Sequence, residues 1–92
     1  MDIMYYVYIL LLSDGTLYKG SSGNIKERFL HHTAGKVQST KNKRPLKLIH
    51  VECYTVKSDA LRREKFLKTT EGRRLLRQQI RDILQHHGCN EK

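Results

Sequence analysis

The sequence has few of the residues that mark disulfide-rich, secreted or membrane-spanning proteins. Only two of its 92 residues are cysteines, Cys53 and Cys89, too few for a disulfide framework and suited to a reducing compartment. The apolar run at residues 5–12 is too short to cross a bilayer. Asp2 is the one charged side chain before this run, so the basic start of a signal peptide is missing. We expect one cytoplasmic domain over residues 1–92, with its core at about 5–85 and a polar tail at 86–92.

Acidic residues are also scarce relative to basic residues. The chain has 18 Lys and Arg against 9 Asp and Glu, a net charge of +9. This surplus favours a polyanionic partner, with nucleic acid as the first candidate and an anionic membrane surface as the second. A basic protein without any such partner is the remaining alternative.

The apolar pattern predicts an α+β domain. Strand-forming residues at 5–10 and 16–19 flank the turn sequence at 13–15 and should pair as an antiparallel hairpin. A third strand is expected at 46–54. Helices are expected at 25–33 with Asn24 as N-cap, at about 58–68, and from about residue 72 to Gly88. The order β-β-α-β-α-α predicts a three-stranded, mostly antiparallel sheet flanked by helices.

Glu64 is the most informative carboxylate, because it lies within the apolar stripe of the second expected helix. Val56, Ala60 and Leu67 share this stripe. Burying an unpaired carboxylate is costly, so Glu64 should have a cationic partner. The spacing leaves two interpretations open, a salt bridge to a nearby Lys or Arg and a metal site.

Four further side chains could act together on a phosphate. Arg28 and His32 are four residues apart and share one face of the first helix. Arginine can bind a phosphate with two hydrogen bonds, and imidazole can bind a phosphate or transfer a proton. Tyr8 and Tyr18 lie on the paired strands and could meet at one end of the sheet. A surface arginine, a half-buried histidine and ordinary strand tyrosines are the alternative interpretation.

The segment 36–47 is basic and contains no acidic residue. Pro45 and its polar neighbours predict a mostly exposed loop. Flexible cations of this kind attract a phosphate backbone without reading its bases, although a solvated loop is the alternative. The candidate nucleic-acid-binding residues are Lys36, Lys41, Lys43, Arg44 and Lys47.

Two other motifs are not supported. His86, His87 and Cys89 lack a second cluster that would complete the four ligands of a zinc site, so a polar tail is the preferred interpretation. The loop sequence GSSG at 20–23 matches neither a P-loop nor a dinucleotide-binding fingerprint.

Taken together, Tyr6-Val7-Tyr8, Tyr18-Lys19-Gly20, Arg28, His32 and Glu64 resemble the GIY-YIG endonuclease domain. The resemblance covers about residues 5–81. It is strongest to the small stand-alone bacterial members that are similar to the nuclease domain of the excision-repair C subunit. The runs STKNKRPLKLI and ALRREKFLK look like that group.

The resemblance implies a three-stranded sheet flanked by helices and a metal-dependent hydrolysis of phosphodiester bonds in DNA, linked to DNA repair. It gives Tyr18 the role of general base and Tyr8 a supporting hydrogen-bonding role. Arg28 would stabilise the phosphate, His32 would occupy the helix position of a His or Tyr, and Glu64 would bind Mg²⁺ or Mn²⁺. A protein partner for target choice is possible, and no membrane is implied.

The motifs also depart from the family pattern. Tyr6 replaces the glycine of the first motif, and Lys19 replaces the apolar residue of the second. Because side chains alternate along a strand, Lys19 should point away from Tyr18, where its charge must reach solvent. These departures motivate a second hypothesis, a nucleic-acid-binding module of the same fold with impaired catalysis.

Overall fold

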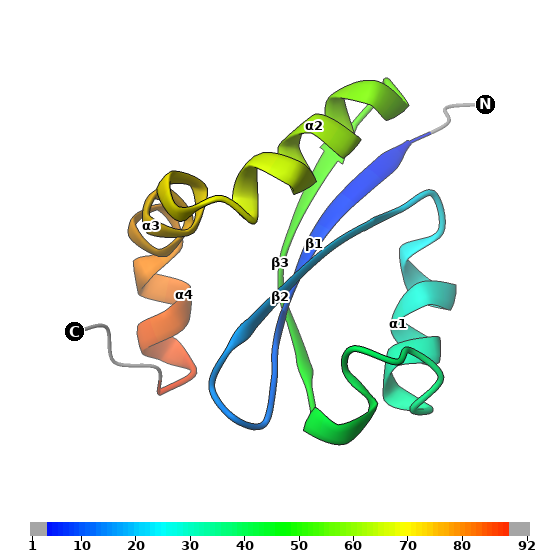
Figure 1. Cartoon of the computed structure of the whole chain (residues 1–92), viewed down its shortest axis with the longest axis vertical. Helices are drawn as coiled ribbons and strands as arrows, with labels where there is room; N and C mark the ends of the chain where they lie inside the picture. The colour runs from blue at the N-terminus through cyan, green and yellow to red at the C-terminus, as the bar shows by residue number, and fades with distance from the viewer. Residues whose placement is uncertain (1–3, 89–92) are drawn as a thin grey trace.

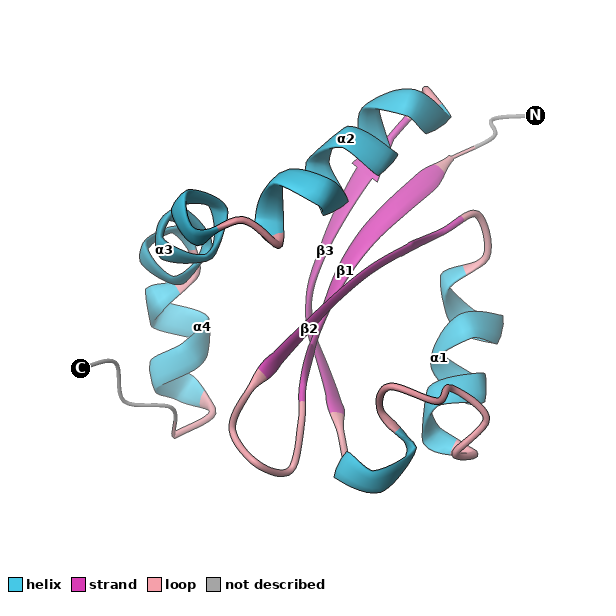
Figure 2. Cartoon of the chain, in the orientation of Figure 1, coloured by secondary structure: helices cyan, strands magenta, loops and turns pink. Residues whose placement is uncertain are grey.

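The computed structural model describes residues 4–88. The strands β1 (Tyr5–Leu11), β2 (Leu17–Ser22) and β3 (Lys47–Tyr54) form an antiparallel sheet in the order β2-β1-β3. The helices are α1 (Ile25–Thr33), the 3-10 helix η1 (Lys41–Lys43), α2 (Lys57–Leu67), α3 (Thr70–Gln79) and α4 (Arg81–His86). The α+β class and the three-stranded antiparallel sheet are confirmed (Figure 1 and Figure 2). Among residues 4–88, no helix has the length and apolar character needed to cross a bilayer.

The central strand β1 is buried on both faces of the sheet. Because side chains alternate along a strand, Val7 and Ile9 point to one face while Tyr8 and Leu10 point to the other. The first face is covered by α2, α3 and α4, and the second by α1 (Figure 1). The helix residues buried in the first core are Ala60, Leu67, Leu76, Ile80 and Leu84. The sheet therefore separates two small cores.

Helix α1 begins as the sequence predicts, with Asn24 as its N-cap. The side chain of Asn24 accepts a hydrogen bond from the backbone N–H of Glu27 at 3.1 Å, which satisfies one of the free donors at the helix start. The backbone N–H of Asn24 donates to the Ser22 hydroxyl at 3.0 Å. The end of β2 and the start of α1 are therefore connected by a short hydrogen-bonded turn.

The expected third helix is in fact two helices, α3 and α4. Ile80 interrupts the helix with φ −109° and ψ 27°, which is not helical. In a straight helix, residues four positions apart drift by about 40° around the axis. Despite this drift, Leu76, Ile80 and Leu84 all enter the same core, at 1–2% exposure.

The turn between α2 and α3 depends on the absence of a side chain at residue 72. Gly72 is buried, and a Cβ atom there would overlap the backbone carbonyl of Phe66. Thr69 caps α3 by accepting a hydrogen bond from the Gly72 N–H at 3.0 Å. The two helices therefore pack with their backbones in close contact.

Gly72→Ala is expected to destabilise the protein by about 1–3 kcal/mol, because the added methyl group forces the α2 and α3 backbones apart. Helix propensity alone predicts the opposite sign, a gain of up to about 1 kcal/mol. The free energy of unfolding in urea measures the difference. Gly23→Ala is the matched control, since its Cβ would lie no closer than 3.9 Å to Tyr5. An equal or higher stability of Gly72→Ala would contradict this account of the turn.

Candidate functional site

The site is built around the hydroxyl of Tyr8, which lies inside the core between the sheet and α1. Tyr8 is 1% exposed, and it faces Gly20 across the β1–β2 ladder. A Cβ atom at Gly20 would lie 2.5 Å from the Tyr8 hydroxyl. The glycine of the second motif therefore leaves the space that the phenol of the first motif occupies.

A chain of hydrogen bonds leads from Tyr8 into the protein through His32. The Tyr8 hydroxyl lies 2.9 Å from His32 Nε2, and His32 Nδ1 lies 2.9 Å from Thr40 Oγ1. Both His32 and Thr40 have 0% exposure. Burial, with the positive charges of Arg28 and His31, lowers the pKa of His32 to about 4. The imidazole is therefore neutral at pH 7. It can accept a hydrogen bond from one neighbour while it donates a hydrogen bond to the other.

Arg28 and Tyr18 complete the cluster on this face. Arg28 Nε donates to the Tyr8 hydroxyl at 3.4 Å. The Tyr18 ring centroid lies 4.9 Å from that of His32 and 6.2 Å from that of Tyr8. Burial raises the pKa of Tyr8 to about 12, while the hydrogen bond from Arg28 acts in the opposite direction. Tyr8 is therefore a neutral phenol, and Tyr18 is the more exposed of the two tyrosines.

Glu64 lies on the opposite face of β2 from this cluster and is hydrogen-bonded to a residue of that strand. Its Oε1 accepts a hydrogen bond from the Ser21 hydroxyl at 2.5 Å, and its Oε2 accepts one from Lys68 Nζ at 2.8 Å. Burial alone would raise the pKa of Glu64, but the bonds from Lys68 and Ser21 outweigh burial and hold it below its usual range. The charge of Arg28 also lowers this pKa. The carboxylate is ionised, and the cluster on the other face acts on it electrostatically.

The donor set at Glu64 fits a divalent cation of the Mg²⁺ type. The side chain keeps 20% exposure, and each carboxylate oxygen has a second lone pair beside the bonds described above. Mg²⁺ commonly takes one or two carboxylates and completes its shell with water and substrate phosphates. No group of three or more His, Cys, Asp or Glu that could hold a metal lies within residues 4–88. A single carboxylate, with the Ser21 hydroxyl beside it, would therefore be the protein's contribution to such a site.

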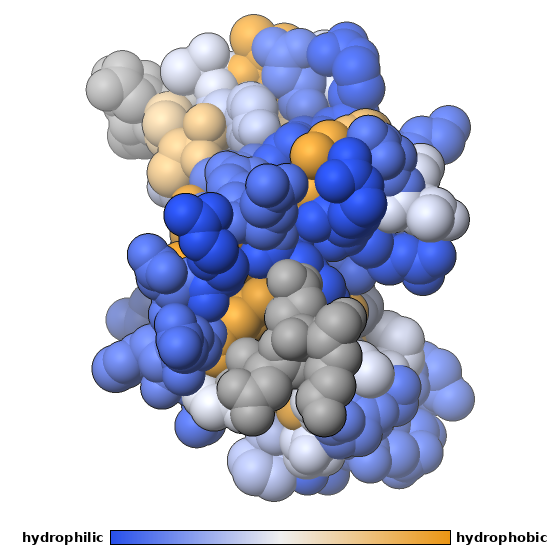
Figure 3. Space-filling view, turned by 90° about the vertical axis from the view of Figure 1, so that its left-hand side faces the viewer, coloured by the Kyte–Doolittle hydropathy of each residue, from blue (hydrophilic) through white to orange (hydrophobic). Residues whose placement is uncertain are grey.

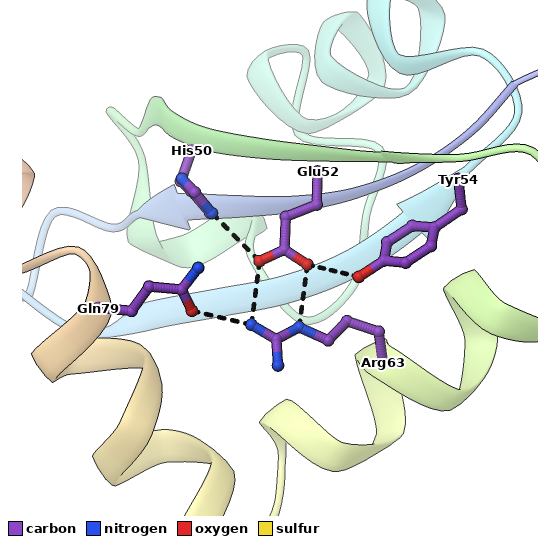
Figure 4. A network of polar contacts seen from close by, with 5 residues as sticks. All are labelled: His50, Glu52, Tyr54, Arg63 and Gln79. Atoms are coloured by element: carbon purple, nitrogen blue, oxygen red, sulfur yellow. Dashed lines mark hydrogen bonds and ion pairs between the residues drawn. The ribbon is translucent and has the colours of Figure 1, made fainter.

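A second part-buried carboxylate, Glu52, differs from Glu64 because its bonding capacity is filled. It receives two hydrogen bonds from Arg63 at 2.9 and 3.1 Å and one from the Tyr54 hydroxyl at 2.9 Å, and His50 lies at 3.2 Å. Arg63 also donates to Gln79 of α3 (Figure 4). This network joins β3, α2 and α3. Glu52 is therefore a structural carboxylate, and Glu64 is the carboxylate that has room for a ligand.

A pocket of about 300 Å³ opens beside Ser21. Tyr5, Ser22 and Lys57 are among its lining residues. It gives a ligand access to the end of β2, next to the hydroxyl that bonds Glu64.

The five cations of the loop are not equally free to bind a phosphate. Arg44 folds back on the chain, donating to the carbonyls of Thr33 at 3.2 Å and Lys41 at 3.0 Å. Lys43 pairs with Asp14 at 3.4 Å. The other three are Lys36 and Lys47, which are exposed, and Lys41, which is half-buried. Part of this predicted binding surface therefore shapes the loop itself.

Within residues 4–88, the histidines near the C-terminus are not part of any group of three or more metal-binding side chains. His86 ends α4, and its ring stacks edge-on against His87 with centroids 5.1 Å apart. Cys89 lies outside the described residues.

Two residues of the site were not identified from the sequence, Ser21 and Thr40. Thr40 lies in the loop predicted to be mostly exposed, yet it is fully buried against His32. Ser21 contacts a residue 43 positions away. Alternation along β2 could have assigned Ser21 to the α2 side of the sheet, but Thr40 carries no local signal.

The chain is similar to known proteins over most of its length. The family model for the GIY-YIG catalytic domain matches residues 4–77. A UPF0213 protein of Staphylococcus epidermidis is 42% identical over 66 residues, covering 71% of this chain and 80% of the relative. A UPF0213 protein of Haloquadratum walsbyi is 36% identical over 88 residues, covering 92% and 99%. The solution structure of a UPF0213 protein from Bacillus halodurans is 28% identical, with a TM-score of 0.53 and coverage of 80% and 82%.

The buried, neutral His32 is expected to make folding stability depend on pH. The unfolded chain binds a proton at His32 below its ordinary pKa of 6.5, and the folded chain only below about 4. Stability therefore falls as the pH drops from 6.5 to 4, by up to about 3 kcal/mol at about 1.4 kcal/mol per pH unit. Urea unfolding at several pH values should show a shallower dependence for His32→Gln than for the wild type.

His86→Gln is the control for this measurement, because His86 is exposed on α4, on the other side of the sheet from α1. It should retain the wild-type dependence between pH 6.5 and 4. Parallel curves for the wild type and His32→Gln would rule out His32 as the source.

Proposed function

Because the chain belongs to the GIY-YIG family, we propose that it is a metal-dependent endonuclease that hydrolyses phosphodiester bonds in DNA. One observation carries the proposal. Tyr8, Tyr18, Arg28 and His32 meet on one side of β2, and the ionised Glu64 lies within electrostatic reach of Arg28. A base, a phosphate-binding cation and a metal ligand are the three groups that such a hydrolysis needs.

The roles follow from the surroundings of each side chain. Tyr18, the more exposed tyrosine, acts as a phenolate after giving its own proton to solvent. It takes a proton from the attacking water while the water oxygen bonds to phosphorus. The P–O bond to the leaving oxygen breaks, and solvent protonates that oxygen. The charge of Arg28, which is bonded to Tyr8 in this cluster, stabilises the phosphate in the transition state. A divalent metal held by Glu64 would neutralise negative charge that develops on the phosphate oxygens.

Tyr8 and His32 position the other groups. The Tyr8 phenol accepts from Arg28 and shares a hydrogen bond with His32, so it fixes the guanidinium next to Tyr18. The neutral imidazole can accept the Tyr8 proton or donate to the Tyr8 oxygen, depending on its tautomer. In the tautomer that accepts from Tyr8, the Tyr8 hydroxyl hydrogen is already used in a hydrogen bond. In the tautomer that donates to Tyr8, this hydrogen is free to bond a phosphate oxygen.

The substrate and setting are part of the same proposal. The net charge of +9 suits a polyanion, and cleavage would be selective for structure or only weakly for sequence. The exposed free Cys53 suits a reducing cytoplasm. A protein partner could direct the domain to its target, for example in DNA repair.

One observation favours a second candidate, a nucleic-acid-binding module without catalysis. Lys68 occupies one oxygen of Glu64, as a structural salt bridge would. The altered motif residues Tyr6 and Lys19 also favour this second candidate. This module would bind nucleic acid with a strong dependence on salt and no requirement for metal.

Glu64→Gln is expected to lower the cleavage rate at least about a hundredfold, because it removes the anionic metal ligand while preserving shape. The rate is measured at low salt on labelled single-stranded, duplex, flap and branched DNA and on RNA. Glu71→Gln is the control, since Glu71 is an exposed carboxylate paired with Arg74. Equal cutting by Glu64→Gln and the wild type would refute the assignment, and binding without cutting by any form would favour the second candidate.

Removal of divalent metal is expected to abolish cleavage. EDTA should stop the reaction, and Mg²⁺ or Mn²⁺ should restore it, because one carboxylate and water can supply the shell that these ions prefer. Binding of Mn²⁺, followed by its electron paramagnetic resonance signal, should be weaker in Glu64→Gln than in Glu71→Gln. Full activity in EDTA would contradict the metal-dependent part of the proposal.

A further inference from the structure

A cluster of three cations, Lys19, Arg73 and Arg77, lies on the Glu64 side of β2, opposite to Tyr18. Lys19 pairs with Ile9 in the β1–β2 ladder, and Ile9 belongs to the core beneath α2, α3 and α4. Lys19 therefore points toward these helices, as strand alternation requires. Burial lowers the pKa of Lys19, and the charges of Arg73, Arg77 and Lys68 lower it further.

Helix α3 presents two of these cations along one side. Arg73 and Arg77 are four residues apart, so they lie one above the other. Each directly follows a residue of the buried stripe, Gly72 and Leu76, and both are therefore on the same flank of that stripe. The side of the molecule that carries α3 and α4 is largely hydrophilic (Figure 3).

The cluster lacks the carboxylates that neutralise cations elsewhere. In the described part of the chain, Lys19, Arg73 and Arg77 form no salt bridge. The paired acids are Asp14, Glu52, Asp59, Glu64 and Glu71, with Lys43, Arg63, Arg62, Lys68 and Arg74. Like charges repel, so this arrangement contributes nothing to stability and fits a site that an anion completes.

Lys68 connects the cluster to the candidate active site. Its ammonium bonds Glu64 at 2.8 Å, and its charge also acts on Lys19. The positive charges therefore lie on β2 and α3 on either side of Glu64, since α2, which carries Glu64, packs against both of these elements. A phosphate bound beside Glu64 would have further phosphates of the same strand next to these cations.

We infer that Lys19, Lys68, Arg73 and Arg77 form a second phosphate-binding surface, which holds the nucleic-acid backbone next to the phosphate that is cut. The inference rests on the proposed function, because it takes its direction from the site at Glu64. The inferred surface also explains why a lysine is present at position 19, since an apolar residue there could not bind a phosphate. A nucleic-acid backbone is favoured over a membrane because the cluster is continuous with that site.

The test compares two double variants that each remove two arginines. Arg73→Gln/Arg77→Gln removes the unpaired arginines of the cluster, and Arg62→Gln/Arg74→Gln removes two that pair with acids elsewhere. Binding of the full-length protein to a labelled DNA duplex is measured in EDTA over a range of salt concentrations. The cluster variant should lose about two from the slope of log affinity against log salt, at about 0.9 per phosphate contact. The control should keep a slope close to that of the wild type.

The possible outcomes separate this inference from the nuclease proposal. Equal slopes for the two double variants would overturn the inference, while cleavage by the wild type would leave the proposed function intact. A reduced slope only in the cluster variant, without cleavage by any form, would support the surface and refute the nuclease. Binding of the wild type to vesicles containing phosphatidylglycerol, but not to DNA, would overturn the inference in favour of a membrane.

Lys19→Gln and a stability measurement guard against misfolding as the explanation. Lys19→Gln should lower the salt slope by about one. The urea midpoint of the cluster variant should equal or exceed that of the wild type, because repulsion is removed. A lower midpoint together with weaker binding would assign these arginines to folding and overturn the inference.

Discussion

The candidate site depends on the need to satisfy one phenol inside an apolar core. Tyr8 lies between the sheet and α1, where its hydroxyl would be costly without a hydrogen-bonding partner. His32 supplies that partner from α1, and Thr40 fixes the other ring nitrogen from the loop before β3. A strand, a helix and a loop are therefore joined by two hydrogen bonds. The helix position of Arg28, one turn before His32, is fixed by the same contacts.

The edge strand β2 divides the chemistry between its two faces. The side chain of Tyr18 points toward α1, and the position of a side chain at Gly20 would lie on the same face. Lys19 and Ser21 point toward the other helices, as the ladder with β1 requires. A tyrosine and an arginine can therefore lie on one side while a carboxylate lies on the other, with a single strand between them. An edge strand permits this arrangement because a substrate can contact both of its faces.

The sequence predicted the parts of this site that alternation and helical periodicity determine. The two tyrosines follow from the strand pattern, and Glu64 stands out because it interrupts an apolar stripe. Thr40 could not be found in this way, because its burial depends on how a polar loop folds back over α1. The bend at Ile80 has a similar origin, since no glycine or proline marks it and only packing against the sheet requires it. The nucleic-acid-binding role of the loop cations stays a prediction, and the contacts that hold Arg44 and Lys43 depend on the tertiary fold.

The bond between Glu64 and Lys68 is consistent with a metal site as well as with a salt bridge. Lys68 is exposed at 55% of its side chain, and an ion pair of this type on a helix contributes only about 0.3–0.5 kcal/mol. A divalent cation with a bound phosphate interacts far more strongly with a carboxylate, so it can displace the ammonium at little cost. The Ser21 bond holds the carboxylate in place meanwhile, because its donor is fixed on β2. Under the proposed function, a displaced Lys68 would remain near Lys19 and would then contact the phosphate backbone of the substrate.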